Sequence, residues 1–96
     1  MRSIKSLKKI FDVERLVVGS WYILYHSNGF NNGGERRILF RFSSSDGNSV
    51  YDDCSYGYFN RVFYKCYSDL SFVLEEGKWC VLASNDEVKK YFPEEV

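Results

Sequence analysis

Six residues between positions 51 and 67 have side chains suited to contacting another macromolecule: Tyr51, Tyr56, Tyr58, Arg61, Tyr64 and Tyr67. Serine, glycine and asparagine are interspersed among them. Tyrosine combined with arginine and small polar residues is typical of protein-binding surfaces, because the ring supplies contact area at little entropic cost and the hydroxyl tolerates water. We therefore predict that these six residues form the contact surface for a protein partner.

The same tyrosines support an alternative prediction, in which the partner is single-stranded nucleic acid. Tyrosine rings beside Arg61 and Lys65 have the chemistry to stack on bases and to hold phosphate. Further cations elsewhere in the chain would extend such a surface: Lys5, Lys8, Lys9, Arg36, Arg37 and Arg41. The two predictions differ in salt dependence, because binding through phosphates weakens steeply as salt is added.

Catalytic and metal-binding chemistry have little support in the chain. His26 is the only histidine, so every Ser–His or Cys–His pairing would have to use it. The cysteines at positions 54, 66 and 80 lack the close spacing of zinc ligands on tight turns. Neither a Gly-x-Ser-x-Gly elbow nor a glycine-rich phosphate loop occurs. We predict a non-enzymatic protein without catalytic residues, metal or cofactor.

The composition fits one small domain with a high aromatic content. A chain of 96 residues allows a single domain over 1–96 and excludes a two-lobed enzyme. Eight Tyr, eight Phe and two Trp make up 19% of the chain, and a domain of this size is expected to leave some of these rings exposed. Phe, Tyr, Met, Ile, Asn and Lys together number 34, whereas Gly, Ala, Arg and Pro number 15. This skew follows AT-rich codons, which favours a phage or another mobile element as the source.

Charge is unevenly distributed, although 13 basic and 13 acidic residues sum to zero. Four cations precede the first acidic residue, Asp12: Arg2, Lys5, Lys8 and Lys9. A basic N-terminal segment therefore sits on a mildly acidic body. Such a segment can meet nucleic acid, an anionic membrane or an acidic protein face, and more often it is only the solvated side of an amphipathic helix.

The cysteine count and the N-terminus indicate the compartment. An odd number of cysteines is not the pattern of a secreted disulfide scaffold. Charged residues interrupt the first 16 positions before the apolar core of a signal peptide can form, and no apolar run is long enough to span a bilayer. We expect a cytoplasmic protein, in the host cytoplasm if it is phage-encoded, with reduced thiols and no membrane association.

Hydrophobic periodicity predicts the elements that position these side chains. Ile4, Leu7 and Phe11 recur at helical spacing, which predicts a basic amphipathic helix over residues 1–16. Residues 17–83 are rich in strand formers and turn signals and predict an antiparallel sheet. Ser84 and Glu87 have the spacing of a capping box, which predicts a short helix over residues 84–93.

Alternation within the sheet region identifies strands and core. It is clearest over residues 36–43, over 70–74, and from 79 to 83 after a hairpin loop at Gly77. Helix and strand patterns compete over residues 58–67, and we favour strand. Large side chains assigned to the core by alternation are Trp21, Phe40, Phe42, Phe72 and Trp79.

These observations predict an α+β fold: an N-terminal helix, four to six antiparallel strands in a curved sheet or small open barrel, and a short C-terminal helix. The function that they favour is that of a small protein-binding module which inhibits or modulates a host protein complex. Single-stranded nucleic-acid binding is the alternative.

Overall fold

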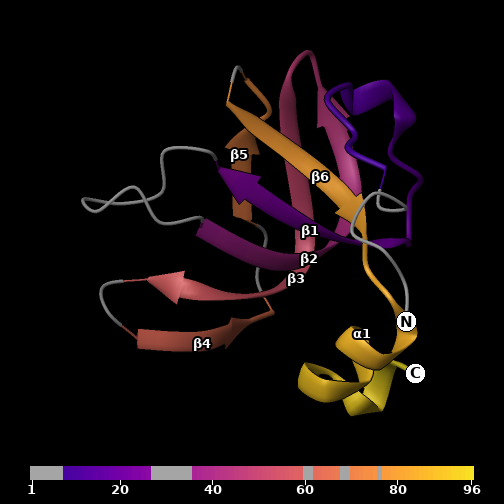
Figure 1. Cartoon of the computed structure of the whole chain (residues 1–96), viewed down its shortest axis with the longest axis vertical. Helices are drawn as coiled ribbons and strands as arrows, with labels where there is room; N and C mark the ends of the chain where they lie inside the picture. Colours follow the sequence, from indigo (N-terminus) through magenta and orange to yellow (C-terminus); the bar gives the residue numbers. More distant parts are fainter. Residues whose placement is uncertain (1–7, 27–35, 60–61, 68–69, 76) are drawn as a thin grey trace.

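A computed structural model describes residues 8–26, 36–59, 62–67, 70–75 and 77–96. Within these ranges the chain forms six antiparallel strands, one α-helix and two 3₁₀ turns (Figure 1). The elements in chain order are η2 (Val13–Arg15), β1 (Trp21–His26), β2 (Arg36–Asp46), β3 (Ser49–Phe59), β4 (Val62–Cys66), β5 (Leu70–Val73), β6 (Lys78–Leu82), α1 (Asn85–Tyr91) and η3 (Pro93–Glu95).

The sheet has the strand order β4-β3-β2-β1-β6, and β5 also pairs with β3. One edge of β3 is shared, because its first half pairs with β5 and its second half with β4. Register shifts in β2 on both sides of Phe42 bend the long β2–β3 hairpin, as bulges do. Figure 1 shows the upper half of this hairpin passing behind β1 and β6, so the sheet curls around an interior.

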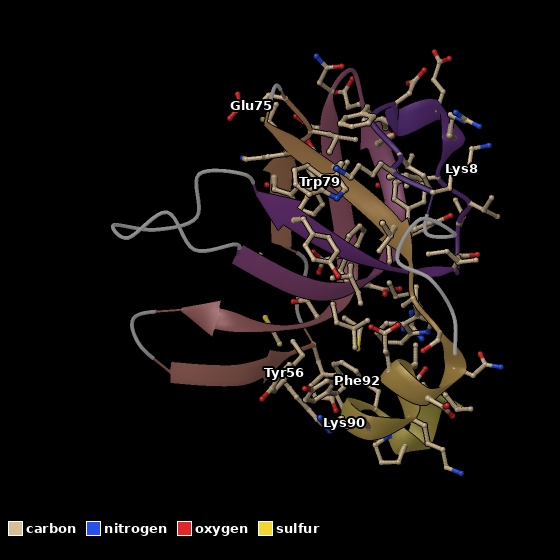
Figure 2. The ribbon with its side chains drawn as sticks, viewed as in Figure 1. Lys8, Tyr56, Glu75, Trp79, Lys90 and Phe92 are labelled. Carbon is tan, nitrogen blue, oxygen red and sulfur yellow. The ribbon has the colours of Figure 1, made fainter. Side chains whose placement is uncertain are left out.

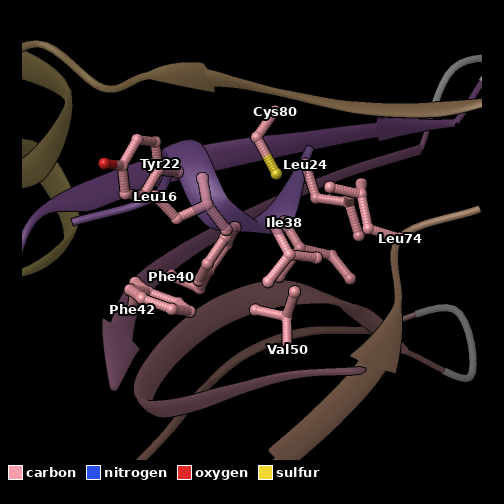
Figure 3. Packing of buried hydrophobic residues seen from close by; sticks show 10 residues of the cluster. Leu16, Tyr22, Leu24, Ile38, Phe40, Phe42, Val50, Leu74 and Cys80 are labelled. Atoms are coloured by element: carbon pink, nitrogen blue, oxygen red, sulfur yellow. The ribbon is translucent and has the colours of Figure 1, made fainter. Parts of the chain in front are cut away.

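A hydrophobic core fills the inner face of the curled sheet (Figure 3). Its buried members come from η2, four of the strands and the segments beside them: Val13, Leu16, Tyr22, Leu24, Ile38, Phe40, Phe42, Val50, Leu74 and Cys80. Phe72 packs against this cluster and is partly buried. The alternation of β2 therefore identified Phe40 and Phe42 correctly as core residues.

A second buried cluster lies on the opposite, outer face, where α1 and η3 cover the sheet. It consists of Ile23, Leu39, Cys54, Val81, Val88 and Phe92. Trp21 and Trp79, which alternation assigned to the core, are only partly buried and pack against this second cluster. Leu39 is buried on the face opposite to Phe40, so β2 is covered by apolar side chains on both sides.

The predicted N-terminal helix over residues 1–16 is wrong. Residues 1–7 lie outside the described part of the chain, and from Lys8 onward the only helical turn before β1 is η2. Ile10 instead forms a β-bridge with Cys80, with N···O distances of 2.7 and 2.8 Å. These hydrogen bonds pair backbone groups at the otherwise open edge of β6. The single 3₁₀ turn η2 places the side chains of both Val13 and Leu16 in the inner core.

The predicted α+β fold class is wrong for the same reason, because the described residues form mostly antiparallel sheet with one C-terminal helix. The predictions of an antiparallel sheet and of a C-terminal helix agree with the structure. Six antiparallel strands form the sheet, and residues 62–66 are strand β4 rather than helix. The capping box is present: the Glu87 amide donates to the Ser84 hydroxyl at 3.2 Å, and the Ser84 amide donates to the Glu87 carboxylate at 2.8 Å. Helix α1 consequently begins directly after Ser84.

The three cysteines differ in burial, which predicts their order of alkylation. Cys54 and Cys80 are buried free thiols, and burial raises the pKa of Cys54 to about 11 and that of Cys80 to about 12. Since the thiolate is the reacting species, iodoacetamide is expected to modify the half-buried Cys66 first in the folded protein. Peptide mass spectrometry measures the order. In concentrated guanidinium chloride, where the protein is unfolded, Cys66 and Cys80 should react at similar rates. Similar rates in the native state would contradict the predicted order.

Candidate functional site

The C-terminal segment, α1 with η3, packs on the outer face of the sheet through Phe92. The Phe92 side chain is fully buried. Its ring centroid lies 4.9 Å from that of Trp21 on β1 and 5.9 Å from that of Tyr67, which approaches edge-on at 87°. The Lys65 ammonium lies 4.9 Å from the Phe92 ring centroid. Phe92 thus contacts side chains from two separate parts of the chain, β1 and the segment that contains Lys65 and Tyr67.

Arg41 on β2 adds an ion-pair network to the same region. Its Nε donates to the Asp53 carboxylate at 2.8 Å, and its Nη1 donates to the Glu95 carboxylate. The guanidinium carbon lies 5.4 Å from the Trp21 ring centroid. The hydrogen bond to Asp53, and after it that to Glu95, raise the pKa of Arg41, so the guanidinium stays charged. Arg41, which was predicted to hold phosphate, is therefore engaged in contacts within the chain.

Tyr67 is the most exposed tyrosine whose side chain the structure describes, with 61% of its surface accessible. Its hydroxyl donates a hydrogen bond to Glu94 Oε1 at 2.8 Å. That hydrogen bond raises the pKa of Tyr67. Lys65 Nζ lies 3.8 Å from the same Glu94 oxygen. The ring is thus accessible to a partner while both its edge and its hydroxyl are held in place.

A second tyrosine pair extends this region. Tyr56 on β3 stacks on Tyr91 of α1, with ring centroids 4.2 Å apart and an angle of 20° between the rings. Figure 2 shows Tyr56 and Phe92 together beside α1, with Lys90 near them. We define the Tyr67 surface as these five residues around η3: Tyr56, Lys65, Tyr67, Tyr91 and Glu94.

The structure brings together only part of the predicted partner-binding set. Tyr56 and Tyr67 meet at the C-terminal segment, whereas Tyr51 is half-buried on the half of β3 that pairs with β5. The backbones of Tyr58 and Tyr64 belong to β3 and β4, and their side chains are outside the description. Arg61 lies outside the described residues.

Sequence reasoning did not find Tyr91 and Glu94 as members of this surface. They lie 24 and 27 residues beyond Tyr67 in the chain and reach it only because α1 folds back onto the sheet. No local pattern in the sequence reports such a contact. The PEE sequence of residues 93–95 shows that acids follow the helix, without indicating which cations they meet.

A separate group of aromatic side chains lies on the outer face away from α1. Tyr25 on β1 and Trp79 on β6 stack with ring centroids 5.7 Å apart and 6° between the rings. Phe11 follows at 6.4 Å from Trp79, and the Lys9 ammonium lies 4.4 Å from the Trp79 ring centroid. We call Phe11, Trp79 and Tyr25 the aromatic row. In Figure 2, Trp79 lies over β1 and β6, well separated from Tyr56 and Phe92.

The basic residues of the alternative prediction are dispersed. Lys8 and Lys9 are exposed, and Lys9 lies over Trp79 of the aromatic row, whereas Arg41 is paired with Asp53 and Glu95. Arg36 and Arg37 begin β2, and their side chains are outside the description. Lys5 lies outside the described residues.

Comparisons of the chain with protein-family models, with curated proteins and with solved structures found no match. Across the described residues, no three His, Cys, Asp or Glu side chains lie close enough to share a metal ion. The helices in the same residue ranges are too short to cross a membrane. The fold and the geometry of the two surfaces therefore carry the functional argument.

Proposed function

We propose that this chain is a small protein-binding module whose contact surface is the Tyr67 surface. The observation that carries the proposal is the state of Tyr67, whose ring is largely exposed although Glu94 and Phe92 hold it in position. Binding of a partner over this ring would cost little conformational entropy of the Tyr67 side chain, because that side chain is already ordered in the free protein.

The surroundings of Tyr67 have the chemistry of a binding hot spot. Tyrosine is enriched at positions that dominate binding energy, and neighbouring polar groups exclude water from such positions. Lys65 and Glu94 supply one charge of each sign beside the ring, and the Tyr56–Tyr91 pair adds aromatic area. The AT-rich composition supports a phage or mobile-element source, and with it a role in inhibiting or modulating a host protein complex.

Affinity capture with an immobilised tagged chain, followed by quantitative mass spectrometry, tests the surface. The bait is exposed to lysate from the source or host cells. Tyr67→Ala is expected to weaken retention of a specific complex by about 30-fold or more, as truncation of a hot-spot residue does. Leu82→Ala is the matched control, because Leu82 is 63% exposed on β6, outside the Tyr67 surface. Equal capture by the two variants, or no complex retained by the unmodified chain, would refute the proposal.

The pH range over which Tyr67 is held follows from the two groups that hold it. Hydrogen bonds from the backbone and from Tyr67 lower the pKa of Glu94, so this interaction is lost as pH falls through that lowered pKa. The raised pKa of Tyr67 means that the hydroxyl donates until pH rises above the usual range of tyrosine ionisation. The ring is therefore held between these two limits.

Glu94→Gln is expected to lower the pKa of Tyr67 toward that of free tyrosine, because the charged acceptor is removed. Titration of the ¹³Cζ resonances of labelled tyrosine measures the change, with Tyr67→Phe identifying the resonance. Glu75→Gln removes one exposed carboxylate elsewhere and serves as the control. An unchanged Tyr67 titration in Glu94→Gln would show that the hydrogen bond is not formed in solution.

A further inference from the structure

The aromatic row forms a second surface, which the Tyr67 surface does not include. The β-bridge between Ile10 and Cys80 places Phe11 beside Trp79, and the β1–β6 register places Trp79 opposite Tyr25. The β1–β2 register then places Arg37 opposite Tyr25. The three rings of the row therefore lie side by side across neighbouring strands. Phe11, at the end of the row, is 62% exposed.

Lys9 beside the row, and Lys8 immediately before it in the chain, are exposed and lack an acidic partner in the described part of the chain. Lys9 lies over Trp79, and Lys8 precedes it in the same segment. Three other described cations do have acidic partners: Lys78 lies 3.4 Å from Glu75, Lys65 lies 3.8 Å from Glu94, and Arg41 contacts Asp53 and Glu95. The positive charge of Lys9 thus lies over Trp79, next to the exposed ring of Phe11, and Lys8 supplies a second charge one residue earlier in the segment.

We propose that the aromatic row with Lys8 and Lys9 binds single-stranded nucleic acid. Bases stack on exposed aromatic rings whatever their sequence, and ammonium groups contact the phosphates. One strand of nucleic acid supplies both planar bases for Phe11 and phosphates for the two lysines. This site is independent of the Tyr67 surface, since the two share no residue.

The salt dependence of binding to fluorescein-labelled oligo(dT) tests the role of the lysines. Fluorescence anisotropy is measured over a series of salt concentrations with an oligonucleotide of about ten nucleotides. Two phosphate contacts predict that the logarithm of the association constant falls with the logarithm of the salt concentration with a slope of about −1.4. The double variant Lys8→Gln, Lys9→Gln is expected to lose most of that slope. The control is Lys89→Gln, Lys90→Gln, which makes the same charge change on α1 and should leave the slope intact.

The stacking contribution is tested with Phe11→Ala. This variant is expected to lower affinity for the oligonucleotide by about 5-fold to 150-fold, the range for one stacked base, with the salt slope unchanged. Val18→Ala is the control, because Val18 is an exposed apolar residue outside the row. Thermal unfolding of both variants, followed by circular dichroism, verifies that each remains folded.

Several results would overturn this proposal: no binding at low salt, equal losses in the test and control variants, or competition by polyglutamate as effective as by unlabelled oligonucleotide. Tyr67→Ala separates the two surfaces, because it should leave oligonucleotide binding unchanged. Phe11→Ala should in turn leave capture of the protein complex unchanged. Loss of oligonucleotide binding in folded Tyr67→Ala would refute the assignment to the aromatic row.

Discussion

Replacing Phe40 with alanine is expected to lower the free energy of unfolding by about 3–5 kcal/mol, the usual cost of removing a fully buried phenyl ring. Phe40 is inaccessible to solvent at the centre of β2, between Tyr22 on β1 and Ser55 on β3. Its ring lies 5.9 Å from that of Tyr22 and meets Phe72 at 80° with centroids 5.1 Å apart. The variant loses the apolar transfer energy and these aromatic contacts, and it leaves a cavity between strands that are fixed by backbone hydrogen bonds.

Urea denaturation followed by circular dichroism measures this loss. A domain of this size has a total stability of about 5–15 kcal/mol, so Phe40→Ala should be marginally folded. Phe11→Ala makes the same chemical change at an exposed site and is expected to cost at most about 1 kcal/mol. Comparable losses in the two variants would contradict the placement of Phe40 at the centre of the core.

Replacing Phe92 with alanine is expected to release the C-terminal segment while the inner core stays intact. Phe92 is fully buried, and its ring contacts Trp21 and Tyr67 and lies under the Lys65 ammonium. Removing a buried ring of this kind costs about 3–5 kcal/mol. The other attachments of this segment are smaller: Val88 in the outer cluster, the stack of Tyr91 on Tyr56, and partly exposed polar contacts of Glu94 and Glu95, which contribute little each. They cannot compensate for the loss, so α1 and η3 should detach from the sheet.

Cysteine labelling distinguishes this local release from global unfolding. Cys54 belongs to the outer cluster together with Phe92, whereas Cys80 belongs to the inner core. In Phe92→Ala, iodoacetamide is therefore expected to modify Cys54 faster while Cys80 stays protected. Val96→Ala is the control, because Val96 is 62% exposed in the same C-terminal segment. Equal acceleration at Cys54 and Cys80 would show that Phe92 holds the whole fold rather than its C-terminal segment.

Release of this segment should also weaken the proposed protein interaction. The Tyr67 surface depends on Glu94 and Tyr91, both of which move with Phe92. The aromatic row is held instead by the bridge between Ile10 and Cys80, which places Phe11 beside Trp79, and by the stacking of Trp79 on Tyr25. The two proposed surfaces are therefore controlled by different attachments, one at each end of the described chain.

Features set by near neighbours in sequence could be predicted for this protein. The capping box of Ser84 and Glu87 is closed by hydrogen bonds across three residues, so its pattern alone locates the start of α1. Alternation over β2 placed Phe40 and Phe42 on one face, because successive strand side chains point to opposite sides. Composition also favoured Tyr67 as a contact residue, which stays a prediction, and nothing in its neighbourhood indicated the hydroxyl contact with Glu94.

Only the tertiary structure decided which backbone hydrogen bonds form and which side chains are buried where segments distant in sequence meet. The helical spacing of Ile4, Leu7 and Phe11 did not produce a helix in the described part of the segment, because the open edge of β6 offers Ile10 backbone partners and the inner core takes Val13 and Leu16. Trp79 alternates like a core residue, but the outer face on which it lies is covered by α1 only in part, so it is partly exposed. A sequence pattern distinguishes the two faces of a strand, and the folding of the chain over each face determines which side chains remain accessible to a partner.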